Sequence, residues 1–139
     1  MSDAQALIAW ANTFLVARQL HAENIKEDFA DGVLLINLVE QAFNQRVAKS
    51  FNLRPKQHFQ KLDNVALVLT FLEKENVVLL SIDGHSIVNG QSKQTVNLLW
   101  NILRELTLRS VSKMRPADGD KNVSIKSVLM QWIKGEVGC

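Results

Sequence analysis

Residues that cross-link or interrupt a chain are scarce in this sequence. It has one cysteine, two prolines and six glycines among 139 residues. The single cysteine, Cys139, excludes an internal disulfide and is typical of a protein from a reducing compartment. Because few positions force the chain to turn, the composition favours a helical protein.

Segments that would take the protein to or across a membrane are also absent from the sequence. The longest apolar runs, such as VVLLSI at residues 77–82, are far too short to span a bilayer. The first residues, MSDAQA, are acidic and polar and lack the basic start of a signal peptide. We therefore expect a cytoplasmic protein without a membrane span.

Acidic residues are missing from one long stretch, residues 41–62, which we call the basic segment. The net charge of the chain is only +2, so a general nucleic-acid surface is not indicated. The basic segment nevertheless carries five cations: Arg46, Lys49, Arg54, Lys56 and Lys61. It is either a solvated loop beside a polar helix, which we favour, or a surface that attracts an acidic partner.

No group of residues has the spacing of a catalytic or metal site. His21, His58 and His85 are dispersed, and none has a second ligand at helical spacing or in a cysteine pair. The neighbouring carboxylates Asp28 and Asp31 are better explained as capping residues than as an acid–base pair. We therefore expect a binding module, with no enzymatic activity and no cofactor.

Apolar residues recur at helical spacing in four long stretches. The predicted helices span residues 3–19, 33–43, 58–76 and 92–109. Their apolar faces predict a core that includes Trp10, Leu35, Leu38, Leu69, Leu99, Trp100 and Leu103. On the third helix the pattern places Phe59 and Ala66 inward and Asn64 outward. Residues 77–90 have the β-branched content of a hairpin, but the helical context favours an extended linker with one short helical turn.

The two ends of the chain share a short pattern. Leu7 and Trp10 in the first predicted helix align with Leu129 and Trp132, at an offset of 122 residues. The later pair belongs to residues 124–134, which have one apolar side and predict a short helix. Such a helix is too short to be stable alone, so we expect it to fold back on its own domain or to pair with another chain.

Four stretches together resemble a calponin homology domain. They are LIAWANTFL from Leu7, FADGVLLINLVE from Phe29, KLDNVALVLTFLEKENVVLLSIDGHSIVNG from Lys61, and KQTVNLLWNILREL from Lys93. The resemblance covers residues 3–110 and is closest to the first of the two domains in tandem actin-binding regions. Within the family it is most similar to the filamin group, with the α-actinin group a near relative.

The resemblance implies an architecture for the whole chain. The fold is all-α: the calponin homology fold, with four principal helices and short connecting helices, followed by a linker and one extra helix. It divides the chain into a first calponin homology domain at 3–110, an interdomain linker at 111–123 and the truncated start of a second such domain at 124–139. Family members have an ordered connection without strands at residues 77–90, which supports the linker interpretation.

The resemblance also implies a function, binding to the sides of actin filaments in a filamin-like cytoskeletal cross-linking protein. Contacts are expected from the first helix, from the last helix with the turn before it, and from the opening helix of the second domain. Because inward residues are needed for packing, we assign the contacts to outward positions. These are Ala9, Asn12, Thr13, Val16 and Arg18 on the first helix, and Lys93, Gln94, Asn97, Asn101, Ile102 and Arg104 on the last.

Other partners follow from the same features of the sequence. The missing second calponin homology domain would be one, and a second copy of the chain, joined through residues 124–134, another. The alternative function is a calponin homology domain that binds microtubules or acts as a signalling scaffold without touching actin. The basic segment keeps that alternative open, because microtubule-binding members of the fold generally present a basic surface.

Overall fold

The computed structural model describes residues 3–114, and all the regular elements in this range are helices. The elements are α1 (Asp3–Leu15), the 3-10 turn η1 (Val16–Arg18), α2 (Val33–Phe43), α3 (His58–Lys74), α4 (Gly84–Val88) and α5 (Ser92–Met114). No strand occurs within this range, so the all-α prediction is confirmed. The single helical turn expected in residues 77–90 is confirmed as α4.

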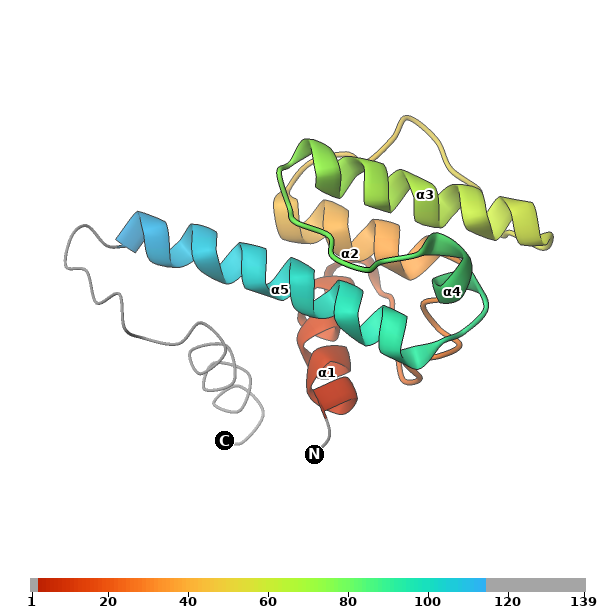
Figure 1. The fold of residues 1–139 in the computed structure, drawn as a ribbon, viewed down its shortest axis with the longest axis horizontal. Coiled ribbons are helices and arrows are strands. Elements are labelled where there is room, and N and C mark those ends of the chain that lie inside the picture. The colour runs from red at the N-terminus through yellow and green to blue at the C-terminus, as the bar shows by residue number, and fades with distance from the viewer. Residues whose placement is uncertain (1–2, 115–139) are drawn as a thin grey trace.

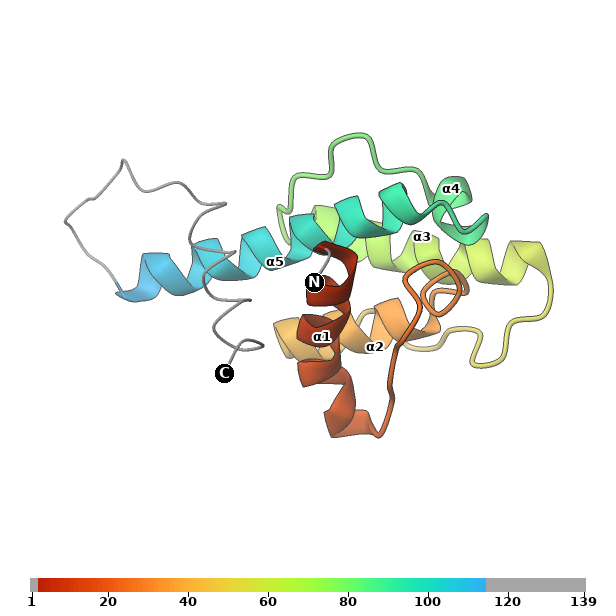
Figure 2. The ribbon, with the colours of Figure 1, turned by 90° about the horizontal axis from the view of Figure 1, so that it is seen from below.

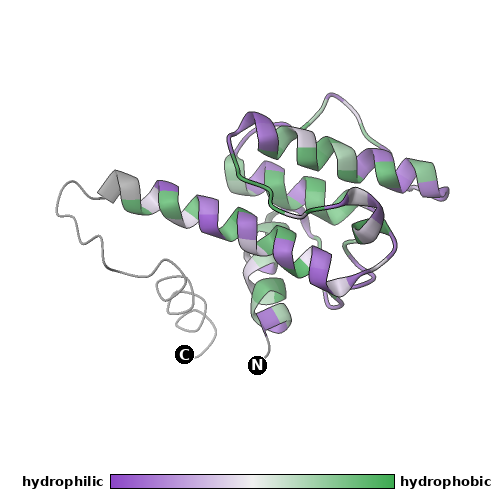
Figure 3. Cartoon of the chain, in the orientation of Figure 1, coloured by the Kyte–Doolittle hydropathy of each residue, from purple (hydrophilic) through white to green (hydrophobic). Residues whose placement is uncertain are grey.

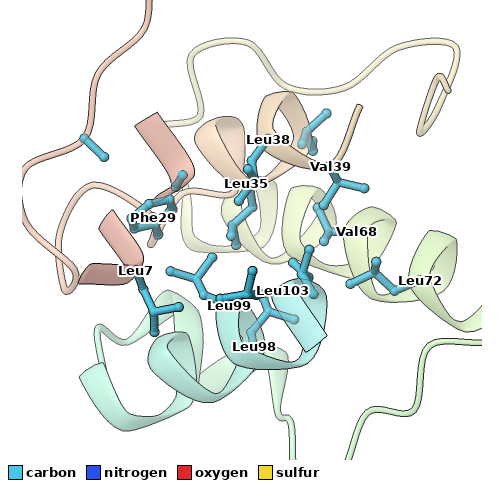
Figure 4. Close-up of a cluster of buried hydrophobic side chains, with 14 of the residues drawn as sticks. Leu7, Phe29, Leu35, Leu38, Val39, Val68, Leu72, Leu98, Leu99 and Leu103 are labelled. Atoms are coloured by element: carbon cyan, nitrogen blue, oxygen red, sulfur yellow. The ribbon is translucent and has the colours of Figure 1, made fainter. Parts of the chain in front are cut away.

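The helices pack in a crossed arrangement (Figure 1). α2 and α3 lie side by side, α5 runs roughly along them, and α1 crosses the three and lies against α2 and α5 (Figures 1 and 2). The core fills the space where these four helices meet, and Leu7, Leu35 and Leu99 converge there (Figure 4). This burial of apolar side chains from four helices is the main stabilising contribution to the fold.

Three helix ends differ from the predicted ones, and the smallest difference is at α3, which ends at Lys74 and not at residue 76. The first helix is α-helical only to Leu15 and then tightens into η1, which ends where Gln19 adopts a left-handed conformation with φ of 60°. The last helix does not end near Arg109 but continues to Met114. The predicted linker and second domain at residues 115–139 lie outside the described residues.

The buried face of α3 is rotated relative to the predicted one. It consists of Asn64, Val65, Val68, Phe71 and Leu72. The prediction for Phe59 and Ala66 is wrong, because Phe59 is 62% exposed and Ala66 is also exposed. The prediction that Asn64 faces solvent is wrong as well, because its side chain is fully buried and hydrogen-bonded.

Most of the predicted core residues are buried. Trp10, Leu35, Leu38, Leu99 and Leu103 lie in the core, whereas Leu69 and Trp100 are only partly buried and pack against it. The prediction for Ile102, which placed it on the outer face of the last helix, is wrong. Its side chain is 0% exposed and lies in the core, so Ile102 cannot touch a partner of the folded domain.

The long connection between α2 and α3 is held to the body of the domain by side-chain amides. Asn64 Nδ2 donates to the carbonyl oxygens of Asp31 and Asn52, and its Oδ1 accepts from the Asn52 N–H. Gln60 Oε1 accepts from the backbone N–H groups of Lys56 and Gln57 at the start of α3. These bonds give residues 44–57, the part of the basic segment between α2 and α3, a defined position although it forms no helix.

Hydrophilic and hydrophobic residues alternate along α5 (Figure 3). This mixture is typical of a helix with one side in the core and the other in water. Among residues 3–114, no helix combines the length and the apolar character that a membrane crossing needs.

Candidate interaction surface

The predicted contact residues of α1 and η1 differ in their exposure to solvent and in the hydrogen bonds that their side chains make within the domain. Thr13, Val16 and Arg18 are exposed, and Ala9 is half-buried. Asn12 is occupied inside the protein, since its Nδ2 donates to the Ala22 carbonyl oxygen at 2.9 Å and its Oδ1 accepts from the Ala22 N–H at 2.8 Å. Its role is therefore to hold the loop that follows η1.

Arg18 is also engaged within the domain. Its Nη1 atom lies 2.7 Å from both Asn37 Oδ1 and Glu40 Oε1, so η1 is joined to α2. Glu40 continues the link, because its Oε2 accepts from the Val47 N–H in the basic segment. With its charge balanced by Glu40, Arg18 is a weaker attractor for a partner than an unpaired cation would be. Val16, 67% exposed, remains a free apolar group at this end of the helix.

Two cations are exposed on the outer face of α5. Lys93 and Arg104 are exposed, and neither forms an ion pair within the described part of the chain. Between them lie Gln94, Asn97 and Asn101, which are half-buried. These three amides form a continuous row along one side of the helix, which we call the amide row.

The amide row is bonded to the segment that precedes α4, residues 78–83, which we call the turn segment. Gln94 Nε2 donates to the Ser81 carbonyl oxygen and Gln94 Oε1 accepts from the Asp83 N–H, both at 2.8 Å. Asn97 Nδ2 donates to the Leu80 carbonyl oxygen at 3.1 Å. The predicted contact residues Gln94 and Asn97 are thus partly used in holding a neighbouring piece of backbone.

The end of the turn segment is fixed by Asp83. Its carboxylate accepts from the Ser86 hydroxyl at 2.8 Å and from the His85 N–H at 3.2 Å, which caps α4. The Ser86 hydroxyl, with smaller contributions from the His85 and Ser86 N–H groups and from the His85 side chain, lowers the pKa of Asp83. His85 also stacks on His58 of α3, with ring centroids 6.1 Å apart, so α4 is held on both sides.

The predicted contact residues therefore do not form one continuous surface. In Figure 2 the C-terminal end of α1 points away from α5, and the bond from Arg18 to Glu40 joins the following η1 to α2, so η1 lies apart from the outer face of α5. The sequence analysis expected contacts from the turn before the last helix but named no residue in it. Val78 and Leu80 of this turn are 56% and 65% exposed. Val77 is buried and Leu79 half-buried, so burial alternates along the run VVLL. An extended run has this period of two, and the pattern could have indicated that every second apolar residue here faces solvent.

Among the hollows of the described surface, two open ones are lined by residues outside α5. The larger, about 800 Å³, lies between α3 and the basic segment and has both apolar and charged walls, with Phe51, Leu67, Arg46 and Lys74 among its residues. The smaller, about 450 Å³, lies beside Leu53 and Arg54. Within residues 3–114 no cluster of histidine, cysteine and carboxylate residues could hold a metal ion.

Together, the crossed helices and the exposed polar face define a small helical interaction domain. Residues 1–107 match the calponin homology (CH) domain, and the chain belongs to that family.

The most similar curated proteins agree with the family assignment. The chain is 32% identical to alpha-actinin of Dermatophagoides farinae, over 94% of this chain and 16% of that protein. It is 31% identical to filamin-C of Rattus norvegicus, over 92% of this chain and 5% of that protein. It is also 31% identical to alpha-actinin-1 of Homo sapiens, over 91% of this chain. The chain thus spans less than a fifth of the length of each of these relatives, and the predicted likeness to both groups is confirmed.

Proposed function

We propose that this domain is the filament-binding module of an actin cross-linking protein and that it binds the sides of actin filaments. The observation that carries the proposal is the outer face of α5, where Lys93 and Arg104 stand exposed and unpaired in a CH domain similar to alpha-actinin and filamin-C. Binding of this kind needs no catalytic group, and it would place the protein in the cytoplasm, on the actin cytoskeleton.

The proposed contact set is smaller than the one expected from the sequence. Lys93 and Arg104 would supply the charge, with Thr13 and Val16 as a separate contribution from the end of α1 and η1. Ile102 is removed from the set because it is fully buried. Gln94, Asn97 and Asn101 are half-buried and are assigned a different role below.

The arrangement of the remaining chain belongs to the same proposal. We assign residues 124–139 to the start of a second CH domain, because their pattern repeats that of α1. In that arrangement the second domain would be a partner of the first. Because α5 continues at least to Met114, we propose that the linker begins after this residue.

Charge reversal on α5 tests the proposal. The double variant Lys93→Glu, Arg104→Glu is expected to weaken co-sedimentation with actin filaments by about tenfold, which corresponds to about 1.4 kcal/mol. Exposed charges at an interface affect the rate and the specificity of association. Lys93 and Arg104 form no ion pair within residues 3–114, so replacing them should leave the domain folded. Helical circular dichroism should stay unchanged.

A matched control is available in the basic segment. The variant Lys49→Glu, Lys56→Glu carries the same change in net charge, but both residues lie in the connection between α2 and α3, away from α5 (Figure 1). It is expected to pellet with actin as the natural chain does. If the control loses binding and the α5 variant keeps it, the assigned face is wrong.

The same pair of variants also tests the second candidate function, binding to microtubules. The five cations of the basic segment form no ion pair within residues 3–114, so their charge is available to an acidic surface. Pelleting with microtubules but not with actin, abolished by Lys49→Glu, Lys56→Glu, would establish that alternative.

A further inference from the structure

We infer that Gln94 and Asn97 act as positioning residues, which hold the turn segment so that Val78 and Leu80 make the apolar contact with the filament. This inference rests on the proposed actin binding and names the part of the domain that would enter the partner's surface. It replaces the expectation that the two amides contact the filament themselves.

The turn segment exposes more apolar surface than its surroundings. Val78 and Leu80 are both more than half exposed, whereas Val77 is buried and Leu79 and Ile82 are half-buried. In an extended stretch, alternate side chains point to opposite sides, so the core side and the solvent side are both apolar here. Two large apolar side chains on one exposed side form a small patch that a partner can desolvate.

Gln94 uses both ends of its side-chain amide on the turn segment. Its Nε2 donates to the Ser81 carbonyl oxygen, and its Oε1 accepts from the Asp83 N–H, both at 2.8 Å. The two bonds bracket Ile82 and use one N–H group and one oxygen lone pair of the amide, which fixes its orientation on the turn segment. A glutamine used in this way contributes to binding through the shape of the backbone that it holds.

The backbone at Ser81 requires such support. Its φ of 60° is left-handed, a conformation that residues other than glycine rarely adopt without compensating contacts. The bond from Gln94 Nε2 ends on the carbonyl oxygen of this same residue. Gln94 therefore stabilises the change of chain direction that follows Leu80.

Asn97 holds the residue just before this bend. Its Nδ2 donates to the Leu80 carbonyl oxygen at 3.1 Å, while Asn101 Nδ2 donates to Asn97 Oδ1 at 3.3 Å and to the Asn97 carbonyl oxygen at 2.8 Å. Because Asn101 donates to the oxygen of the Asn97 amide, the nitrogen of that amide is directed to Leu80. The amide row thus fixes the backbone from Leu80 to Asp83 at three points.

The neighbouring charges indicate the chemistry of the matching surface. Lys93 precedes Gln94, and Arg104 lies seven residues beyond Asn97, so both cations lie near the side of α5 that carries the amide row. The matching surface on the side of the filament would be an apolar hollow bordered by carboxylates.

A double-mutant cycle with actin co-sedimentation tests the inference. Leu80→Ser and Gln94→Ala are each expected to weaken binding by about tenfold. If Gln94 acts by positioning Leu80, the double variant should be no more than about twofold weaker than Leu80→Ser alone, because the group that Gln94 positions is already gone. Independent losses that multiply to about a hundredfold would show a direct contact by Gln94 and overturn the inference.

Two further measurements separate positioning from unfolding. Hydrogen exchange at the Asp83 amide should become at least about tenfold faster in Gln94→Ala, while the amides of α3 stay protected. Gln91→Ala is the matched control, since Gln91 is exposed at the start of α5 and its side chain makes no hydrogen bond to the turn segment. It should change neither exchange nor binding.

The outcomes distinguish this inference from the proposed function. If the natural chain does not pellet with filaments, the proposed function and the inference both fail. If the natural chain pellets and Leu80→Ser pellets equally well, the turn segment is not the contact, and only the inference fails. The same holds if Asp83 exchange is unchanged in Gln94→Ala.

Discussion

At the scale of single residues, the fold depends most on one buried asparagine. Asn64 accepts one hydrogen bond and donates two, and its partners, Asp31 and Asn52, lie in the two long connections on either side of α2. Gly32 lies so close that a Cβ atom there would be 2.5 Å from the Asn64 Cβ, with φ of +84°. The side chain thus joins α3 to both loops in space that only glycine leaves free.

Removing the Asn64 amide should destabilise the domain strongly. In Asn64→Ala the Asp31 carbonyl oxygen and the Asn52 N–H and carbonyl oxygen lose their partner in a region with little access to water. We expect a loss of about 3 kcal/mol in the free energy of unfolding, measured by urea denaturation. The neighbouring variant Asp63→Ala, at an exposed position, should stay within about 0.5 kcal/mol of the natural chain. A loss below about 1 kcal/mol in Asn64→Ala would contradict the role given to this residue.

At the scale of elements, the sequence predicted the existence of the helices better than their faces. Periodicity placed four long helices and the short turn in 77–90 close to where they occur. It treated Asn64 as solvent-facing because asparagine is polar, although the two loops that bury it supply its hydrogen-bond partners. Those partners come from distant parts of the chain, which periodicity within one helix does not contain.

α5 shows the same limit for the candidate site. Ile102 was assigned to the outer face, yet the buried side of the helix includes Leu98, Leu99, Ile102 and Leu103. Lys93 and Arg104 were correctly placed outside, because an unpaired charge is expelled from a core whatever its neighbours are. The roles of Gln94 and Asn97 could not be predicted, since they depend on where residues 78–83 pass along the helix.

The burial of Ile102 predicts that this residue contributes to the stability of the domain and not to filament binding. Ile102→Ala leaves a cavity in the core, and we expect the free energy of unfolding to fall by about 2–5 kcal/mol in urea denaturation. Arg104→Ala, two residues away on the exposed side, should change it by no more than about 0.5 kcal/mol. At temperatures where Ile102→Ala is still folded, its binding to filaments should equal that of the natural chain. Weaker binding without a loss of stability would restore Ile102 as a contact residue.

At the scale of the whole molecule, the helices described within residues 3–114 close around one core. At one end of the domain Arg109 of α5 donates to the Glu75 carbonyl oxygen at 2.9 Å and lies 5.0 Å from the centre of the Phe43 ring of α2. Hydrogen bonding by the Glu105 carboxylate, followed by that of Glu75, raises the pKa of Arg109. Arg109 thus ties α2, α3 and α5 together within the last two turns of α5 that the structure describes.

Because the described helices share one core, the role of the rest of the chain can be tested by removing it. Residues 124–134 carry apolar residues at helical spacing, including Leu129 and Trp132, and a segment of that length gains stability only by packing against something. We propose that it packs against a second copy of the chain. Light scattering at about 100 µM should then show a dimer for the full chain and a monomer for a chain ending at Met114, with equal urea midpoints at low concentration, where both are monomers. A monomeric full chain that is more stable than the shortened one would show instead that the segment packs on its own domain.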